Sequence, residues 1–554
     1  MLYFNIVNYH RGVYNIMKLE QIEIPITNPL LEDYRNEKSS ILSFFHYPNR
    51  EESFTRRLED LQNHPIRREQ LVMVIRKFME PLEISEKAEE HLRELENNAV
   101  VVIGGQQSGL LTGPLYSVHK AISVILLAKQ QRESLQVPVV PIFWIAGEDH
   151  DIDEINHTFT AVNGRLEKHI YGKRSKKKTM ASTTPLDVDA TRQFIYEIFK
   201  QYGETAHTEK LLAKIDTILL KSKTYTDFFV RLMNWLFKEE GLLFIDAAYS
   251  SLREYESPYF EQLVQNAEKI ADIVTIREAD LAELGYGMPV GATKEAANLF
   301  YIRDGERFLL ERHDGKFINR MANVQFTKSD MLELARKKPT CLSNNVITRP
   351  LMQDMVFPVL AFVGGPGELA YWSTLKGAFE TLGMKIPVFV PRMNMTIIDR
   401  QVQTLLKEIQ ISVTDAIVGK TTTYKTSFEE KVYDEKSKEM VEQTRQLLQS
   451  QYDVIQGHLY KLNIHLEKLV DKNLSIHETQ LDFLMRKIEQ EVLLKHDVEL
   501  RKYRTIEDRI LPGGGLQERV FNPFQFMNEY GEELIKDMIT LPFKINGQHN
   551  VIYL

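Results

Sequence analysis

Residues 98–157 have the sequence NAVVVIGGQQSGLLTGPLYSVHKAISVILLAKQQRESLQVPVVPIFWIAGEDHDIDEINH, and this stretch decides the fold. A β-branched apolar run at 100–103 precedes a glycine-bearing loop, an apolar-periodic segment at 116–129 and a second apolar run at 139–145. A short apolar strand, a helix and another short apolar strand form a βαβ unit of a parallel sheet. The sequence therefore predicts an α/β protein with a parallel-sheet core.

Polar residues follow both predicted strands, where parallel sheets bind ligands. Gln106, Gln107 and Ser108 follow the first strand, and Glu148, Asp149, His150 and Asp151 follow the second. Three interpretations of the acidic cluster compete: substrate binding with acid–base chemistry, a divalent metal site, or a helix N-terminus whose acids only favour the dipole. The strand-end position favours the first. Metal is the least favoured, because the sequence fixes no ligand geometry.

Further strands extend this core at 242–246, 356–363 and 387–390. The second of them is followed by Gly364-Gly365-Pro366-Gly367-Glu368, and the last is closed by Pro391-Arg392-Met393-Asn394-Met395-Thr396. Alternating segments at 299–303, 308–312 and 315–317, with Asp-Gly turns at 304–305 and 314–315, predict a small antiparallel element.

The predicted organisation has seven parts. These are a non-native or disordered extension (1–16), a helical lead-in (17–97), the first part of the core with a basic connecting insertion near 160–240 (98–254), a second insertion (255–345), the second part of the core (346–425), a coiled-coil dimerisation region (426–510) and a closing segment (511–554).

The coiled coil is predicted from Ile455, Leu459, Leu462, Leu466 and Leu469, which follow 4-3-4-3 spacing. Ser475 and Glu478 fit a capping box, so we expect a turn at 471–474 between two antiparallel helices rather than one long helix. The seam suits dimerisation and packing on the chain's own globular part equally well.

Composition excludes several classes of protein. A length of 554 residues predicts two or three domains, and a net charge of −8 argues against a nucleic-acid-binding protein; the basic run at 173–178 is best explained as a solvated loop. The single cysteine, Cys341, excludes an intramolecular disulfide and a multi-cysteine zinc site, and suits a cytoplasmic protein. No apolar stretch approaches the ~20 residues of a membrane span, and the first residues do not form a secretory signal.

The loop at 104–109 lacks the Gly-Lys-Ser/Thr of a phosphate-binding P-loop, but it precedes a helix start, which favours anions. Tyr116-Ser117-Val118-His119 lies where class I aminoacyl-tRNA synthetases carry His-Ile-Gly-His, and Arg392 opens the segment where they carry Lys-Met-Ser-Lys-Ser. Only His119 and one cation, Arg392, match. A packed helix histidine is the alternative interpretation of His119.

Four segments together resemble one family, the cysteine ligases of bacillithiol biosynthesis (BshC). They are GQQSGLLTGPLYSVHKAIS, VPVVPIFWIAGEDHDIDEINH, LSNNVITRPLMQDMVFPVLAFVGGPGELAYW and LPGGGLQERVFN. The resemblance implies a Rossmann-type core like that of class I synthetases, two connecting insertions and a C-terminal coiled coil that pairs two subunits. It also implies amide formation between L-cysteine and glucosaminyl-malate in the cytoplasm, through a cysteinyl intermediate activated by ATP or another nucleotide, with Mg²⁺ or ADP as accompanying ligands.

The resemblance also suggests roles for individual residues. The catalytic residues would be His119, Asp149, His150 and Asp151. The substrate would contact Gln106, Gln107, Gly109, Tyr116, Glu148, Arg349, Gln353, Gly365, Glu368 and Tyr371. The nucleotide would contact Gly113, His119, Lys120 and Arg392, and no protein-held metal is expected. The alternatives are a nucleotidyltransferase acting on another small molecule and a non-catalytic dimeric scaffold with a degenerate core.

Overall fold

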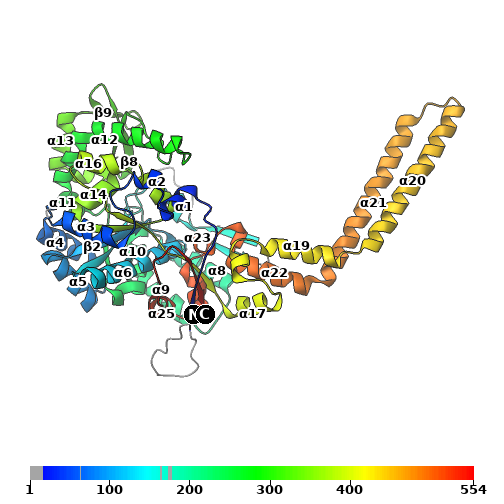
Figure 1. The fold of residues 1–554 in the computed structure, drawn as a ribbon, viewed down its shortest axis with the longest axis horizontal. Coiled ribbons are helices and arrows are strands. Elements are labelled where there is room, and N and C mark those ends of the chain that lie inside the picture. The colour runs from blue at the N-terminus through cyan, green and yellow to red at the C-terminus, as the bar shows by residue number, and fades with distance from the viewer. Residues whose placement is uncertain (1–16, 63, 163–164, 173–177) are drawn as a thin grey trace. The chain divides into compact units, whose positions relative to one another are not determined.

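The computed structural model describes residues 17–62, 64–162, 165–172 and 178–554 (Figure 1). The predicted extension 1–16 and most of the basic run 173–178 lie outside the described residues. Five strands form the central sheet: β2 (Val100–Gln106), β3 (Val139–Ile145), β6 (Leu243–Asp246), β12 (Val359–Gly364) and β13 (Val388–Pro391). Their order is β13-β12-β2-β3-β6 with every pair parallel. Numbered along the chain this is 3-2-1-4-5, the order of a Rossmann-type sheet, so the predicted fold class is confirmed.

The strands lie in this sheet because they are apolar, apart from the polar residues that end β2 and β6, and almost wholly buried. Helix α6 (Tyr116–Leu135) connects β2 to β3 and contacts β2, β3 and β12. It runs six residues beyond the predicted end and stops where Gln136 adopts a left-handed conformation, with φ of 55°. Phe143 of β3 packs against Phe244 of the neighbouring strand β6 and against Phe229, so aromatic side chains fill the core beside these strands.

The lead-in is helical, as predicted, except at its start. Its helices are α1 (Pro29–Arg35), α2 (Ser39–Leu42), α3 (Glu51–Leu61), α4 (Arg68–Met79) and α5 (Glu86–Asn97). The start is strand β1 (Lys18–Ile22), antiparallel to β15 (His549–Tyr553), which is parallel to β14 (Asn394–Ile398). The sequence pattern predicted neither strand β1 nor strand β14. The strand that pairs with β1 and β14 lies far away along the chain, and a local sequence pattern cannot reveal such a pairing.

Two insertions interrupt the core. The first contains α7 (Ile152–Ile155), β4 (His157–Val162), β5 (Arg165–Ile170), α8 (Val188–Tyr202), α9 (Thr208–Leu220) and α10 (Tyr225–Phe237). The second contains α11 (Ser250–Tyr255), α12 (Ser257–Glu283), β7 (Ala296–Arg303), β8 (Glu306–His313), β9 (Lys316–Asn319), β10 (Val324–Thr327), α13 (Lys328–Lys337) and β11 (Leu342–Asn344). Asp304 and Gly305, with φ of 54° and 80°, make the predicted turn between β7 and β8.

Short helices flank the last two strands of the central sheet, and others follow β14 and end the chain. These are α14 (Thr348–Val356), α15 (Pro366–Trp372), α16 (Lys376–Thr381), α17 (Arg400–Glu408), α18 (Val413–Ile417), α23 (Gln517–Val520), α24 (Pro523–Tyr530) and α25 (Leu534–Ile539). Among the described residues, no helix combines the length and apolarity needed to cross a membrane.

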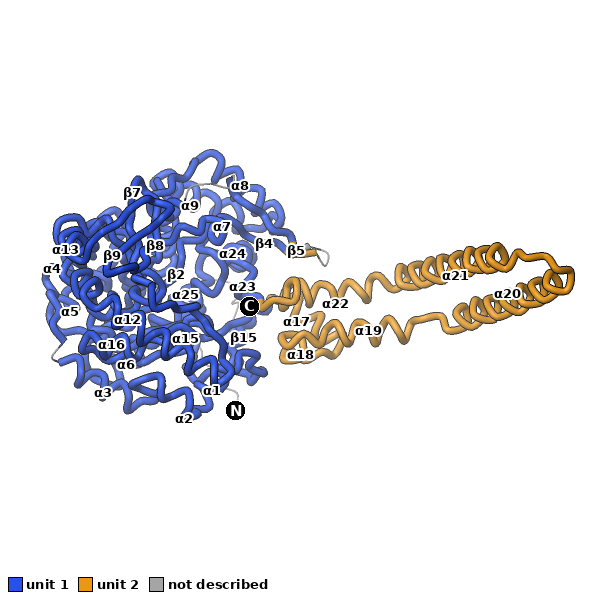
Figure 2. Tube along the Cα trace, turned by 90° about the horizontal axis from the view of Figure 1, so that it is seen from above, with its two compact units in different colours: residues 1–160, 167–398, 517–554 blue, residues 161–166, 399–516 orange. Residues whose placement is uncertain are grey.

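The chain divides into two compact units, coloured separately in Figure 2. The second unit holds residues 161–166 and 399–516, and its helices include α19 (Thr421–Val432), α20 (Glu435–Lys461), α21 (Glu467–Lys495) and α22 (Asp497–Ile510). Helices α20 and α21 pair as the expected hairpin, and the Tyr452 hydroxyl donates to Asn473 Oδ1 at 2.6 Å.

The position predicted for the hairpin turn was wrong. The chain reverses between α20 and α21, where Asn463 has φ of 59°, and Ser475 and Glu478 lie inside α21. Asparagine tolerates this left-handed conformation better than most residues. The seam residues Leu462 and Leu466 therefore belong to the turn region.

Candidate functional site

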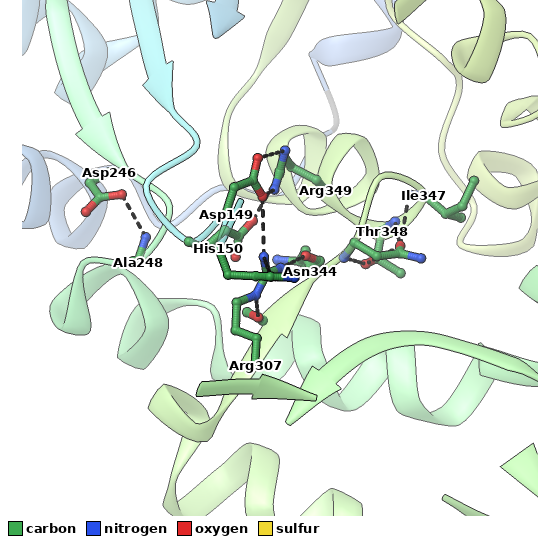
Figure 3. A network of polar contacts seen from close by, with 12 residues as sticks. Asp149, His150, Asp246, Ala248, Arg307, Asn344, Ile347, Thr348 and Arg349 are labelled. Atoms are coloured by element: carbon green, nitrogen blue, oxygen red, sulfur yellow. Dashed lines mark hydrogen bonds and ion pairs between the residues drawn. The ribbon is translucent and has the colours of Figure 1, made fainter. Parts of the chain in front are cut away.

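The acidic cluster after β3 is held by arginines from other elements (Figure 3). Arg349 of α14 donates to Glu148 Oε1 at 2.9 Å and to Asp149 Oδ1 at 2.5 Å. Arg253 of α11 pairs with the second oxygen of Glu148, and neither side chain is exposed by more than 2%. Burial alone would raise the pKa of Glu148, but the charges of Arg253 and Arg349 outweigh it and lower the pKa to about 2. Glu148 is thus an anion that fixes two arginines.

A third arginine, Arg307 of β8, fixes His150. Its guanidinium donates to Ser343 Oγ at 3.0 Å and to the carbonyl of Asn344 at 2.7 Å, and Nη1 lies 3.4 Å from His150 Nδ1. Burial and the Arg307 charge lower the pKa of His150, which favours the neutral ring. Because arginine can only donate, Nδ1 accepts and the ring proton lies on Nε2. His150 therefore offers a hydrogen-bond donor.

Asp246 ends β6 at the same edge of the sheet. It accepts from Ser182 Oγ at 2.5 Å and from the backbone N–H of Ala248 at 3.0 Å. Burial raises its pKa to about 6. A Cβ on Gly147 would lie 2.4 Å from Asp246 Oδ1, so only glycine allows this approach.

Lys120 and Glu368 meet between β2 and β12, the topological switch point of the sheet. The buried Lys120 ammonium donates to Glu368 Oε2 at 2.6 Å, to the carbonyl of Gly105 at 2.7 Å and to Gln106 Oε1 at 3.1 Å. The backbone N–H of Gly365 also donates to Glu368 Oε2, at 2.7 Å. All three protons of the ammonium are used within the protein.

Arg392 and His119 share the buried carboxylate of Glu518. Arg392 donates to the two Glu518 oxygens at 2.9 and 2.7 Å, and His119 Nδ1 lies 3.0 Å from Oε2. Burial would raise the pKa of Glu518, but Arg392 and His119 lower it far below its usual range. The His119 side chain has no exposed surface, a placement that favours the packed-histidine interpretation.

Two buried tyrosines lie near the charged groups of this edge. Burial and the Glu368 charge raise the pKa of Tyr371, which also interacts with Arg349 and Asp149. Burial likewise raises the pKa of Tyr116, against the charge of Arg392, whose guanidinium lies 5.7 Å from the Tyr116 ring. The polar ends of several strands thus form one neighbourhood at the carboxyl edge of the sheet.

Other predicted site residues take varied positions. Gln107 donates to Glu154 at 2.8 Å, Asp151 is exposed, and Gln353 is buried within α14. Gly109 and Gly113 make a tight turn, since a Cβ on Gly109 would lie 2.7 Å from Gly113 Cα. This packing accounts for both glycines without a ligand.

Sequence reasoning did not assign four residues that complete the site: Asp246, Arg253, Arg307 and Glu518. The acid that ends the run 242–246 was visible as a strand-end acid, which is a usable signal. Arg253 and Arg307 lie in segments without any motif of their own, and Glu518 lies in the segment LPGGGLQERVFN, which carries the family resemblance but suggested no role for this residue.

A parallel sheet in this strand order, with charged side chains gathered at its carboxyl edge, defines a Rossmann-like α/β protein. The family comparison agrees: residues 17–393 match the model "Bacillithiol biosynthesis BshC, N-terminal Rossmann-like domain", and residues 395–554 match "Bacillithiol biosynthesis BshC, C-terminal coiled-coil domain". The chain belongs to the BshC family.

Full-length relatives support this membership. A protein of Lysinibacillus sphaericus is 50% identical over 538 residues, which cover 97% of this chain and 100% of the relative. Proteins of a Geobacillus species and of Bacillus anthracis are each 38% identical, with 97% of this chain and 100% of the relative covered. All three carry the name "Putative cysteine ligase BshC".

Proposed function

We propose that this protein is a ligase of bacillithiol biosynthesis that joins the carboxyl group of L-cysteine to the amine of glucosaminyl-malate. Family membership supports the reaction class. The observation that carries the proposal is the gathering of Asp149, His150 and Glu368 with their cations at the carboxyl edge of a Rossmann-ordered sheet.

The amide product requires an activated carboxyl group, so the proposal includes a cysteinyl intermediate formed with a nucleotide as co-substrate. The two cations that sequence assigned to its phosphates, Lys120 and Arg392, hold Glu368 and Glu518. Because both cations are neutralised by these carboxylates, they do not fit a phosphate as they stand.

In this proposal His150 donates its Nε2 proton to an oxygen that gains negative charge during the reaction. Arg307 fixes the ring through Nδ1, and the arginine pair on Asp149 fixes the loop that carries His150. The substrate carboxylates and hydroxyls would contact the polar groups of the same edge.

The test is an assay of the full chain with L-cysteine, glucosaminyl-malate and ATP, with product detected by mass. We expect cysteinyl amide that disappears when any of the three is omitted or when L-serine replaces L-cysteine. A folded protein that forms no amide with ATP or another nucleoside triphosphate would contradict the proposal, and transfer of a nucleotide without amide formation would favour a nucleotidyltransferase.

His150→Ala should lower kcat by about 100-fold or more, the usual loss when one donor to a developing anion is removed. Its thermal midpoint should stay within a few degrees of wild type, because the side chain is only half-buried. His313→Ala, at a histidine whose side chain is 65% exposed, is the control and should leave turnover unchanged. Undiminished turnover of folded His150→Ala would remove His150 from the mechanism.

A further inference from the structure

Glu368 has one carboxylate oxygen that the protein fixes and one that it leaves open. Oε2 accepts from the Lys120 ammonium at 2.6 Å and from the N–H of Gly365 at 2.7 Å. Within the part of the chain that the structure describes, no hydrogen bond engages Oε1. The side chain is 24% exposed, so the open oxygen lies where a ligand or water can reach it.

Three other carboxylates at the strand ends have no oxygen that is free of hydrogen bonds. Both oxygens of Glu148 bind arginines, and its side chain has no exposed surface. Asp149 accepts from Arg349 and Arg307, and Asp246 is buried against Ser182 and the N–H of Ala248. At each of these three carboxylates both oxygens already accept a hydrogen bond, so none of them offers the unoccupied acceptor oxygen that Glu368 has.

His150 is also poorly placed to accept a proton. Arg307 Nη1 faces its Nδ1, so the free nitrogen, Nε2, carries the proton of the neutral ring. Unlike Glu148, Asp149, Asp246 and His150, Glu368 thus combines an open acceptor oxygen, partial exposure and a fixed position at the switch point.

We propose that Glu368 is the general base of the ligation, a role that rests on the proposed function. The amine nitrogen attacks the carbonyl carbon of cysteine in a mixed anhydride with phosphate or a nucleoside monophosphate. The C–N bond forms, and the bond from that carbon to the phosphate oxygen breaks with its electron pair on the leaving phosphate. The nitrogen gives one proton to Glu368 Oε1, while Lys120 and the Gly365 N–H hold Oε2.

A purely structural role, helix capping, accounts for part of this geometry. Glu368 reaches back to the N–H of Gly365 at the start of α15, which is half of a helix capping box. Capping uses Oε2 alone and needs no buried lysine. A capping role and a base role also differ experimentally, because only a base can be replaced by a small carboxylate supplied in solution.

The test compares Glu368→Ala and Glu368→Gln with wild type and with Glu380→Ala, a matched change at a glutamate of α16 whose side chain is 50% exposed. We expect kcat of both Glu368 variants to fall by about 100-fold or more. Formate should raise the rate of Glu368→Ala at least tenfold. It should not rescue Glu368→Gln, because the amide side chain fills the space that formate would occupy. It should not change the rate of Glu380→Ala.

Each outcome decides one question. If folded Glu368→Gln has the same kcat as a wild-type protein that makes amide, the base assignment is overturned and the proposed function stands. If formate does not restore the rate of Glu368→Ala and both variants have a lowered thermal midpoint, Glu368 acts as a helix cap. This result also overturns the base assignment. Absence of amide with the wild-type protein overturns the proposed function and the base together.

Discussion

At the scale of single residues, Gly105 shows how closely β2 and β3 approach at the edge of the site. A Cβ there would lie 2.4 Å from the carbonyl oxygen of Trp144 and 3.1 Å from its Cβ. Both atoms belong to a buried strand and cannot move aside without shifting the sheet.

Gly105→Ala should therefore lower the free energy of unfolding by about 1–3 kcal/mol, the usual cost of overpacking. Gly367→Ala is the matched control, because a Cβ there meets nothing within 4 Å and alanine is the better helix former. Denaturant titration followed by circular dichroism gives both values. Equal stability of the two variants would show that the strands are not packed as described.

The residue scale also shows what sequence could predict of the site. Asp149 and His150 were found because they lie in the polar segment that follows an apolar strand, and Glu368 because it follows glycines at another strand end. Arg253 and Arg307 were not predicted as site residues, because they lie in α11 and β8 and are buried against ion-pair partners that are distant in the sequence. Local pattern marks the end of a strand but not a tertiary ion pair.

At the scale of elements, the central strands were predictable because each is a short run of apolar residues with polar neighbours. The pairing of β1 with β15 was not, because it joins residues such as Lys18 and Tyr553 across almost the entire chain. The hairpin turn was misplaced for another reason. The apolar seam continues through the turn, so its spacing cannot locate the reversal.

The hairpin register can be tested by crosslinking in a Cys341→Ser background. Gln456 and Asp471 face each other across α20 and α21, with Nε2 and Oδ1 3.3 Å apart. A short bismaleimide should therefore join Gln456→Cys to Asp471→Cys nearly completely. Gln456→Cys with Glu489→Cys, the pair that a turn at 471–474 would favour, should not react, because position 489 lies about 27 Å further along α21. The reverse result would refute the observed register.

At the scale of the whole molecule, the chain leaves its first unit after residue 398 and re-enters it at 517. The returning segment supplies Glu518 to Arg392 and β15 to the sheet with β1 and β14. Removing one partner of a buried ion pair typically costs 3–5 kcal/mol, so the first unit depends on residues that follow the coiled coil.

The helical hairpin carries apolar side chains that its own two helices do not cover. Leu447 of α20 is 66% exposed, and Phe483 of α21 is 50% exposed. Exposed large apolar side chains on a helical hairpin favour an interaction surface, and for a coiled-coil hairpin a second copy is the expected partner. We therefore expect a homodimer, with twice the 64.5 kDa of one chain, by light scattering at micromolar concentration.

Leu447→Glu combined with Phe483→Glu should convert this dimer to a monomer, because the paired surfaces would then bury uncompensated charges. Gln451→Glu, which adds a charge at an exposed polar position of α20, is the control and should leave the dimer intact. Far-ultraviolet circular dichroism must show the same helix content in all three proteins. A monomeric wild type, or a double variant that stays dimeric, would show that the hairpin has another role.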